Sequence, residues 1–191
     1  MRKYIFVGII LPFFIISCSC KNKNETNKHK TIQSIYVLFY AYSFETRIPV
    51  NSNEITKRIG KTFKSEDNKI LLKEGSVLDT TINDEFVLKE ISDEICKLHS
   101  IRKSQPVDAR ISCLIKYKDG SSEKLCIGGY FANDIEYKGV RCLKNNKLLF
   151  LIKKSINYYS WMDDNIMRNQ IELKDESIHR DSIKGYFGKQ Y

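Results

Sequence analysis

The segment 107–117, "VDARISCLIKY", constrains the fold of this chain more than any other stretch. Its apolar residues occupy every second position: Val107, Ala109, Ile111, Cys113, Ile115 and Tyr117. Because the side chains of a strand point alternately to the two faces of a sheet, this period predicts a half-buried strand. Asp119-Gly120, a strong hairpin signal, follows at once, and residues 121–129 supply the returning strand. The sequence therefore predicts an antiparallel sheet.

The length of the hairpin loop decides which residues of the two strands face each other. A two-residue loop places Cys113 beside Cys126, where a disulfide can form. A three-residue loop, with Gly120 in the left-handed region, sets Cys113 opposite Leu125. We favour the second register, because it puts the apolar residues of both strands on one face of the sheet. It predicts no bond between Cys113 and Cys126.

Hydrophobic patterns elsewhere predict further strands. Residues 34–44 are rich in β-branched and aromatic side chains and almost unbroken in hydrophobicity, which is typical of a strand buried on both faces. Residues 134–143 predict another strand beside the hairpin. A short strand is also expected within 68–75. We expect a sheet of about four strands.

Two segments have the apolar spacing of helices. Thr81 and Asp84 have the spacing of a capping box, with Asp in place of the commoner Glu. A single apolar stripe follows at helical intervals: Val87, Ile91, Ile95 and Leu98. Residues 147–161 also fit helical spacing, although 149–152 alone fit a buried strand; we expect a helix.

These elements predict an α+β fold, in which an antiparallel sheet of about four strands packs against one or two helices. The chain length suits one domain with its own core, and we place that domain at 31–161. Residues 162–191 are mostly polar and charged, so we expect them to form a polar C-terminal tail.

The start of the chain has the anatomy of an export signal. A basic "MRKY" precedes an apolar run of 13 residues from Tyr4 to Ile16, and small residues follow. A helix needs about 20 apolar residues to cross a bilayer, so this run is too short to span one. We expect residues 1–17 to be a signal peptide that is not part of the fold.

Ile15-Ile16-Ser17-Cys18 resembles the lipobox of bacterial lipoproteins. The resemblance implies that Cys18 receives a diacylglycerol thioether, that the signal is cut before it, and that the new amino group is acylated by a fatty acid such as palmitate. Two or three acyl chains hold a protein stably at a membrane, whereas one chain binds reversibly. Cys20 is an alternative site, but the aliphatic pair lies too early for it. Ser19 after the modified cysteine resembles the sorting pattern for the outer membrane.

The remainder of the chain is similar to small Bacteroidota lipoproteins that carry no assigned activity. The similarity rests on the strongly hydrophobic first strand, a "TRIPV" turn at 46–50 and "LIKKSINYY" at 151–159. It implies a lipid-anchored location in the cell envelope and little about chemistry.

Residues 18–30 are polar and rich in Lys and Asn, so we expect a flexible tether between the lipid and the domain. The whole chain carries a formal net charge of +9. Such a surplus favours anionic neighbours, namely lipid headgroups or acidic glycans, although a plain solvated Lys-rich surface also explains it. Nucleic acid is not expected as a partner, because an exported chain rarely meets it and no reader motif is present.

No short motif marks a metal, cofactor or catalytic site, and we expect neither metal nor cofactor. The histidines lie far apart along the chain: His29, His99 and His179. None of the later cysteines forms a C-x₂-C pair, and they allow three disulfide pairings that the sequence leaves open: Cys96, Cys113, Cys126 and Cys142. Asp134 with Glu136, or Glu45 with Asp108, would suit glycoside hydrolysis only if the fold brought the carboxylates within about 5–10 Å.

"NYYSWM" at 157–162 is the strongest candidate for a binding surface. Tyr158, Tyr159 and Trp161 cannot all face one core, and aromatic rings with one wet edge are enriched at interfaces. Alternatively, Tyr159 and Trp161 cover an edge of the sheet. Arg47, which is flanked by Glu45, is a second candidate, although we favour a structural ion pair for it.

Three hypotheses of function follow. The first is a non-catalytic, membrane-anchored binding protein of the cell envelope, which engages an envelope protein or an anionic glycan. The second is a hydrolase that acts on envelope glycans or peptidoglycan. The third is an inhibitor or immunity lipoprotein that blocks a toxin or lysozyme.

Overall fold

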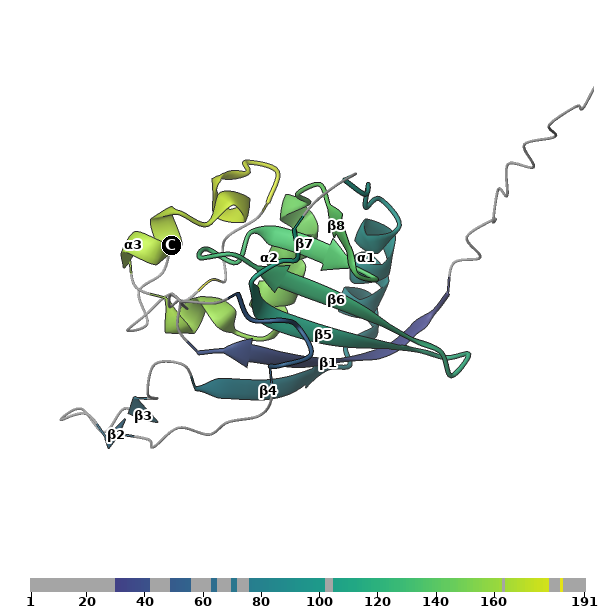
Figure 1. Cartoon of the computed structure of the whole chain (residues 1–191), viewed down its shortest axis with the longest axis horizontal. Coiled ribbons are helices and arrows are strands. Elements are labelled where there is room, and N and C mark those ends of the chain that lie inside the picture. Colours follow the sequence, from purple (N-terminus) through teal and green to yellow (C-terminus); the bar gives the residue numbers. More distant parts are fainter. Residues whose placement is uncertain are drawn as a thin grey trace, which may run out of the picture.

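A computed structural model describes residues 30–41, 49–55, 63–64, 70–71, 76–101, 105–162, 164–178 and 183. The expected signal peptide with Cys18, nearly all of the tether, and Arg47 lie outside the described residues. The described part has an α+β fold built on an antiparallel sheet, as predicted (Figure 1).

The sheet has six strands in the described part, where about four were expected. In spatial order they are β4 (Val77–Ile82), β1 (Ile32–Tyr40), β5 (Ala109–Tyr117), β6 (Ser122–Gly128), β7 (Asp134–Tyr137) and β8 (Val140–Cys142). All neighbours in this sheet are antiparallel. Two short strands form a separate ladder: β2 (Phe63–Lys64) and β3 (Ile70–Leu71).

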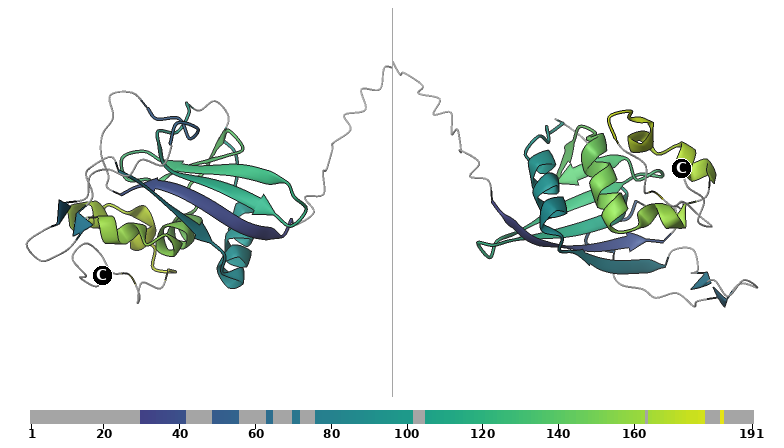
Figure 2. Two further views of the ribbon diagram at one scale, coloured as in Figure 1. Left: turned by 90° about the horizontal axis from the view of Figure 1, so that it is seen from below. Right: turned by 180° about the vertical axis from the view of Figure 1, so that it is seen from behind.

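The helices cover one face of the six-stranded sheet (Figure 2). The described part contains α1 (Glu85–Ile95), α2 (Asn146–Ser155) and α3 (Asp164–Arg168), with the 3₁₀ turns η1 (Tyr158–Trp161) and η2 (Ile171–Lys174). Apolar side chains of α1 and α2 form one cluster with the facing side chains of β1, β5 and β6. This cluster is the main core.

The predicted hairpin register is confirmed. Cys113 faces Leu125, and Ile111 faces Ile127. Gly120 has φ of +81°, in the left-handed region that the three-residue loop requires. Cys113 and Cys126 are not joined, and none of the four described cysteines is in a disulfide.

The prediction that the first strand is buried on both faces is wrong. Along β1, buried residues alternate with half-buried ones: Ile35 and Val37 are fully buried, whereas Tyr36 and Leu38 are not. The helices seal one face of the strand, but loops cover the other face in part. A hydrophobic residue such as Leu38 therefore packs beneath a loop instead of a helix.

Two of the additional strands lie in segments for which the sequence predicted a different structure. Residues 134–143 form β7 and β8, because Lys138 and Gly139 both have positive φ (54° and 75°) and turn the chain back. Thr81, expected at a helix start, belongs to β4 and pairs with Tyr36. The helix cap is Asp84, whose Oδ1 accepts two backbone N–H groups of the first turn at 3.0 Å each.

The helix expected over 147–161 is confirmed in part: α2 ends at Ser155, and η1 follows it. The packed body continues beyond residue 161. Met162, Ile166, Met167 and Leu173 are all buried against the main core. Part of the segment 162–191 that we expected to be a polar tail therefore belongs to the packed body. The polar composition led to this wrong prediction because two of the polar residues, Gln170 and Glu172, are themselves buried.

A buried ion pair joins α2 to η2. Lys153 Nζ lies 2.7 Å from Glu172 Oε1 and 2.6 Å from Gln170 Oε1, and the three side chains are inaccessible to solvent. The Tyr159 hydroxyl donates to the same Glu172 oxygen at 3.0 Å. Burial lowers the pKa of Lys153, and the Glu172 carboxylate opposes this shift. The pair links α2 to η2, in the segment that returns onto the core.

Removing one member of this pair should destabilise the protein far more than removing both. Glu172→Leu leaves the Lys153 ammonium buried without its counter-ion, and we expect a loss of about 3–5 kcal/mol in the free energy of unfolding, measured with urea. Lys153→Met combined with Glu172→Leu should lose clearly less, because no unpaired charge remains. Equal losses in the single and double variants would contradict this account.

Candidate functional site

Two loops lie on the face of the sheet opposite the helices (Figure 2). Residues 49–55 and 105–108 are held together by reciprocal hydrogen bonds: Ala109 N–H donates to Val50 O, and Val50 N–H to Asp108 Oδ1, both at 2.8 Å. Ser112 Oγ of β5 donates to Ser52 O at 3.2 Å. A small apolar cluster fills the space beneath the loops: Ile55, Val77, Val107, Ala109 and Cys126.

Gly128 allows the second loop to lie directly on β6. A Cβ atom at this position would lie 2.1 Å from Asp108 O and 2.3 Å from Val107 Cγ1, both far inside van der Waals contact. The neighbouring Gly129 N–H donates to Asp108 O at 2.8 Å. The close approach fixes where residues 105–108 lie relative to the strands.

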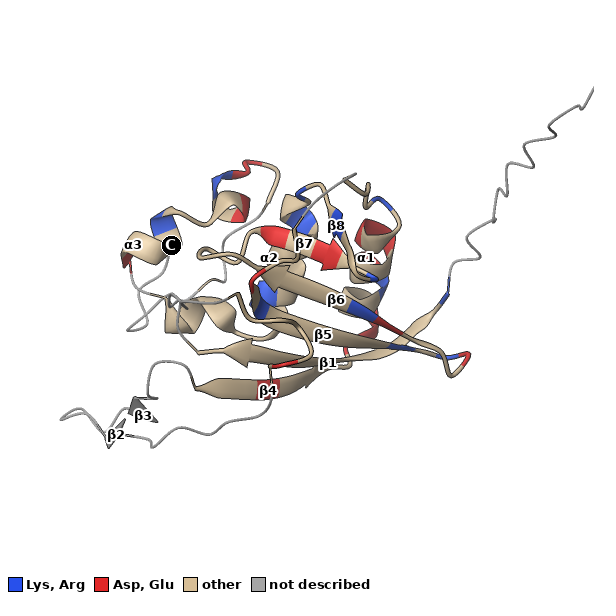
Figure 3. Ribbon diagram, viewed as in Figure 1, with Lys and Arg blue, Asp and Glu red and all other residues tan. Residues whose placement is uncertain are grey.

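A pocket of about 360 Å³ opens between these loops and the last three strands of the sheet. Its lining comes from the first loop (51–53), the second loop (Gln105 and Pro106), β6 (Lys124), β7 (Glu136), the β7–β8 turn (Gly139) and β8 (Arg141). Figure 3 shows acidic residues on β7 beside basic residues on β6 and β8. The pocket is therefore polar and carries charges of both signs.

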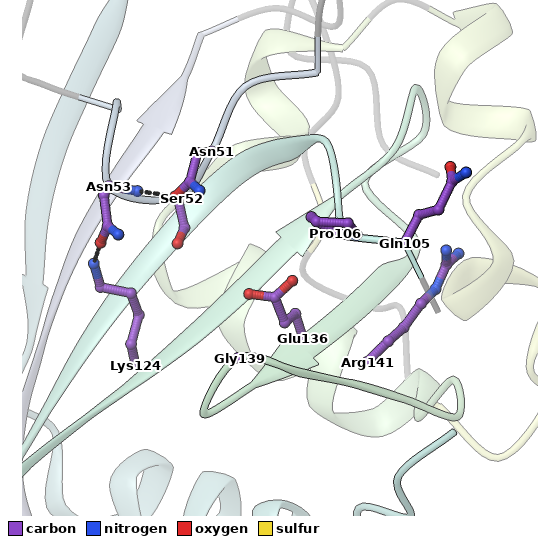
Figure 4. Close-up of a pocket in the computed structure, with 9 residues that line it drawn as sticks. All are labelled: Asn51, Ser52, Asn53, Gln105, Pro106, Lys124, Glu136, Gly139 and Arg141. Carbon is purple, nitrogen blue, oxygen red and sulfur yellow. Dashed lines mark hydrogen bonds between the residues drawn. The ribbon is translucent and has the colours of Figure 1, made fainter. Parts of the chain in front are cut away.

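The Lys124 end of the pocket is ordered by the first loop (Figure 4). Lys124 Nζ donates a hydrogen bond to Asn53 Oδ1. The Asn53 backbone N–H in turn donates to Asn51 Oδ1 at 2.9 Å. Two amide side chains thus accompany the ammonium group.

The opposite end carries Arg141 and Gln105, with Glu136 between the two ends (Figure 4). Arg141 Nη2 lies 2.8 Å from Asp134 Oδ1, and both side chains are about one-third exposed. Glu136 Oε2 accepts a hydrogen bond from the Val107 backbone N–H at 3.3 Å. Register explains the grouping, because Glu136 and Arg141 are directly opposed in adjacent strands.

The carboxylate pairs considered from sequence meet only in part. Asp134 and Glu136 lie two residues apart on one strand, so their side chains share the pocket face. Asp134 is tied to Arg141, as described above. Asp108 forms an ion pair with Arg110 at 2.6 Å, and Glu45 lies outside the described residues.

The aromatic residues expected to form a surface are largely internal. Tyr158 is 1% exposed and Tyr159 is 2% exposed, whereas Trp161 is half-buried and packs against the core. Asn157 adopts φ of 53°, which turns the chain at the start of η1. Tyr158 meets Phe39 edge-on, with ring centroids 6.0 Å apart. Two rings with so little exposure cannot form the contact surface that the sequence suggested.

The described thiols are poor nucleophiles. Burial raises the pKa of Cys126 to about 12, and burial also raises the pKa of Cys113 well above its usual value. Cys96 is exposed, but partial desolvation and the charge of Asp93 raise its pKa as well. At neutral pH these groups stay protonated.

Within the described ranges, no group of three or more His, Cys, Asp and Glu residues is arranged to hold a metal ion. In the same part of the chain, every helix is too short or too polar to cross a bilayer.

Sequence reasoning missed Lys124 and Arg141, and it named Glu136 only as one of a pair of carboxylates with Asp134. Their signal was present, since polar residues at the outward positions of strands mark the second face of a sheet. Such residues ordinarily contact only solvent, and no pattern in the sequence places Gln105 above them.

Comparisons of the chain with protein-family models, with curated proteins and with solved structures found no match.

The close approach at Gly128 can be tested by substitution. Gly128→Ala should lower the free energy of unfolding by at least about 2 kcal/mol, because its methyl group meets a backbone carbonyl that no rotamer change can move. Ser122→Ala, at an exposed position of the same strand, is the matched control. Hydrogen exchange at the Gly129 amide should accelerate in the Gly128 variant only. Two variants of equal stability would refute the close approach.

Proposed function

We propose that this chain is a lipid-anchored protein of the bacterial cell envelope that binds another envelope component, without catalysis, through the pocket beside β6, β7 and β8. The observation that carries the proposal is the concave polar surface itself. Its charged side chains are held by hydrogen bonds or an ion pair to the loops and strands, and it lies on the helix-free face of the sheet. Pockets of about 300–1,000 Å³ with a few well-placed polar groups are typical ligand sites.

The lipobox-like residues 15–18 support the anchor, and the fold is compatible with it. Lys30, the first described residue, contacts the β5–β6 turn: its Nζ donates to Ser121 Oγ at 3.0 Å. The residues between Cys18 and Lys30 can extend at most about 40 Å. An acylated Cys18 would therefore keep the domain close to a membrane. We propose that this is the outer membrane.

A hydrolase is the second candidate, because Asp134 and Glu136 share the pocket face of β7. Binding is favoured over hydrolysis, since both carboxylates have structural partners in Arg141 and the Val107 N–H. Glycoside hydrolysis needs two carboxylates at the scissile bond, and the Asp134 carboxylate is held instead by the Arg141 guanidinium.

The anchor is tested by lipid labelling in bacteria that express and export the full chain. A clickable palmitate analogue should label the wild-type protein, and Cys18→Ser should abolish labelling. Cys20→Ser is the matched control, since it removes the neighbouring thiol and should retain the label. Intact-mass analysis should show a diacylglyceryl group on Cys18. A bare thiol at that position, or label that depends on Cys20, would refute the anchor.

Binding through the pocket is tested by photo-cross-linking in the same cells. A photoreactive amino acid at the exposed pocket residue Gln105 should give a discrete adduct, whereas the same group at Lys89, on α1, should not. When Lys124→Ala and Arg141→Ala are introduced together in the chain that carries the Gln105 probe, the yield of the adduct should fall at least about tenfold.

A charge-matched control keeps this test specific. Lys89→Ala with Lys174→Ala also removes two positive charges, but from exposed positions on helical elements. This pair should leave the Gln105 adduct unchanged. Absence of an adduct at Gln105, or an adduct that survives the pocket substitutions, would count against the proposal.

A further inference from the structure

The pocket presents more hydrogen-bond donors than acceptors to a ligand. The Arg141 guanidinium has five N–H donors. Among the described residues it pairs with Asp134 through Nη2, which leaves other donors for a ligand. The Lys124 ammonium has three donors, one of which Asn53 accepts. Within the described part, the Gln105 amide makes no hydrogen bond to the protein. A ligand rich in acceptors would satisfy these groups.

The charges of the lining favour an anionic group on that ligand. Among the lining residues, Lys124 and Arg141 contribute two positive charges and Glu136 contributes one negative charge. Asp134, which is not among the lining residues, pairs with one edge of the Arg141 guanidinium. A planar guanidinium can hold Asp134 on one edge and a second anion on another, and it matches the bidentate geometry of carboxylate and phosphate groups. The Arg141 end is therefore the place for the anionic group.

The remaining lining favours hydroxyl groups. Glu136 Oε2 accepts from Val107, whereas Oε1 has no hydrogen-bond partner among the described residues. Each ligand hydroxyl can donate to this oxygen and accept from a neighbouring amide, such as that of Gln105 or Asn51. Pro106 and Gly139 supply little apolar surface, so a ligand with a large hydrophobic part would leave the polar groups unpaired.

We propose that this pocket binds a saccharide that carries an anionic group, with the carboxylate or phosphate at Arg141 and the sugar hydroxyls along Glu136 and the amide side chains. This inference rests on the proposed function and names the ligand class of the same site. The volume of about 360 Å³ accommodates one or two sugar units and excludes a bulky folded partner from its interior.

The test is a calorimetric titration of the mature, lipid-modified protein, purified in detergent. The probes are a disaccharide that contains glucuronic acid, glucose 1-phosphate, the neutral disaccharide cellobiose, and glutarate, an anion without hydroxyls. We expect at least one acidic saccharide to bind with a dissociation constant below about 1 mM. Cellobiose and glutarate should each bind at least about tenfold more weakly, because each lacks one of the two recognised features. Comparison of the first two probes shows whether the anionic group of the ligand is a carboxylate or a phosphate.

Variants assign the binding to named side chains. Arg141→Ala should weaken binding of the acidic saccharide at least about tenfold. Arg141→Lys should retain part of the affinity, since it keeps the charge but loses the bidentate geometry of the guanidinium. Glu136→Gln should weaken binding of the saccharide but not of glutarate, because the substitution removes an acceptor for hydroxyls and also removes a negative charge near the anion site. Lys89→Ala, on the opposite face, is the control. Circular dichroism confirms that each variant is folded.

The outcomes separate this inference from the proposed function. If neither acidic saccharide binds with a dissociation constant below about 1 mM, or if cellobiose binds as well as they do, the inference is refuted. The same holds if Arg141→Ala and Arg141→Lys both bind like the wild type. If the Gln105 cross-link in cells still depends on Lys124 and Arg141, the pocket remains a binding site for a different ligand class, and the proposed function stands.

Discussion

The register of the β5–β6 hairpin is the constraint on which the core and the pocket both depend. It sets Cys113 opposite Leu125, so that the apolar residues of both strands face α1 and α2. A slip by one residue would turn every side chain of β6 to the other face. Lys124 would then enter the core and Leu125 would lie in solvent. The same pairing that buries the main core thus leaves a polar face for the pocket.

That second face is shaped by polar contacts on a small apolar base. Asp108 receives the Val50 N–H and pairs with Arg110, which places both loops over the sheet. Gly128 provides the close approach that lets residues 105–108 lie against β6. On the helical face, the buried pair of Lys153 and Glu172 plays a similar specifying role. Buried ion pairs add little net stability, but they disfavour alternative packings that leave a charge unpaired.

The proposed anchor and the proposed ligand fit one location. An acylated Cys18 would hold the domain near a membrane surface, where acidic sugars and phosphates are concentrated in bacterial envelopes. The formal net charge, which falls from +9 to +7 when Arg2 and Lys3 leave with residues 1–17, would favour the approach of such ligands, and the pocket would select among them by geometry. Burial of Tyr158 and Tyr159 moves the proposed binding surface from η1 to the pocket face of the sheet.

The sequence by itself determined the hairpin, its three-residue loop, α2 and most of α1, because these depend on local periods, turn residues and caps. It also determined which side chains of β5 and β6 face the core. Tertiary structure decided the rest: β4 forms because Thr81 pairs with Tyr36, and the polar residues after 161 pack because Glu172 meets Lys153. The pocket joins side chains from positions 51 to 141, and Gln105 and Pro106 belong to a loop that rests on Gly128. Contacts between residues distant in sequence leave no period along the chain, so only the folded structure brings them together.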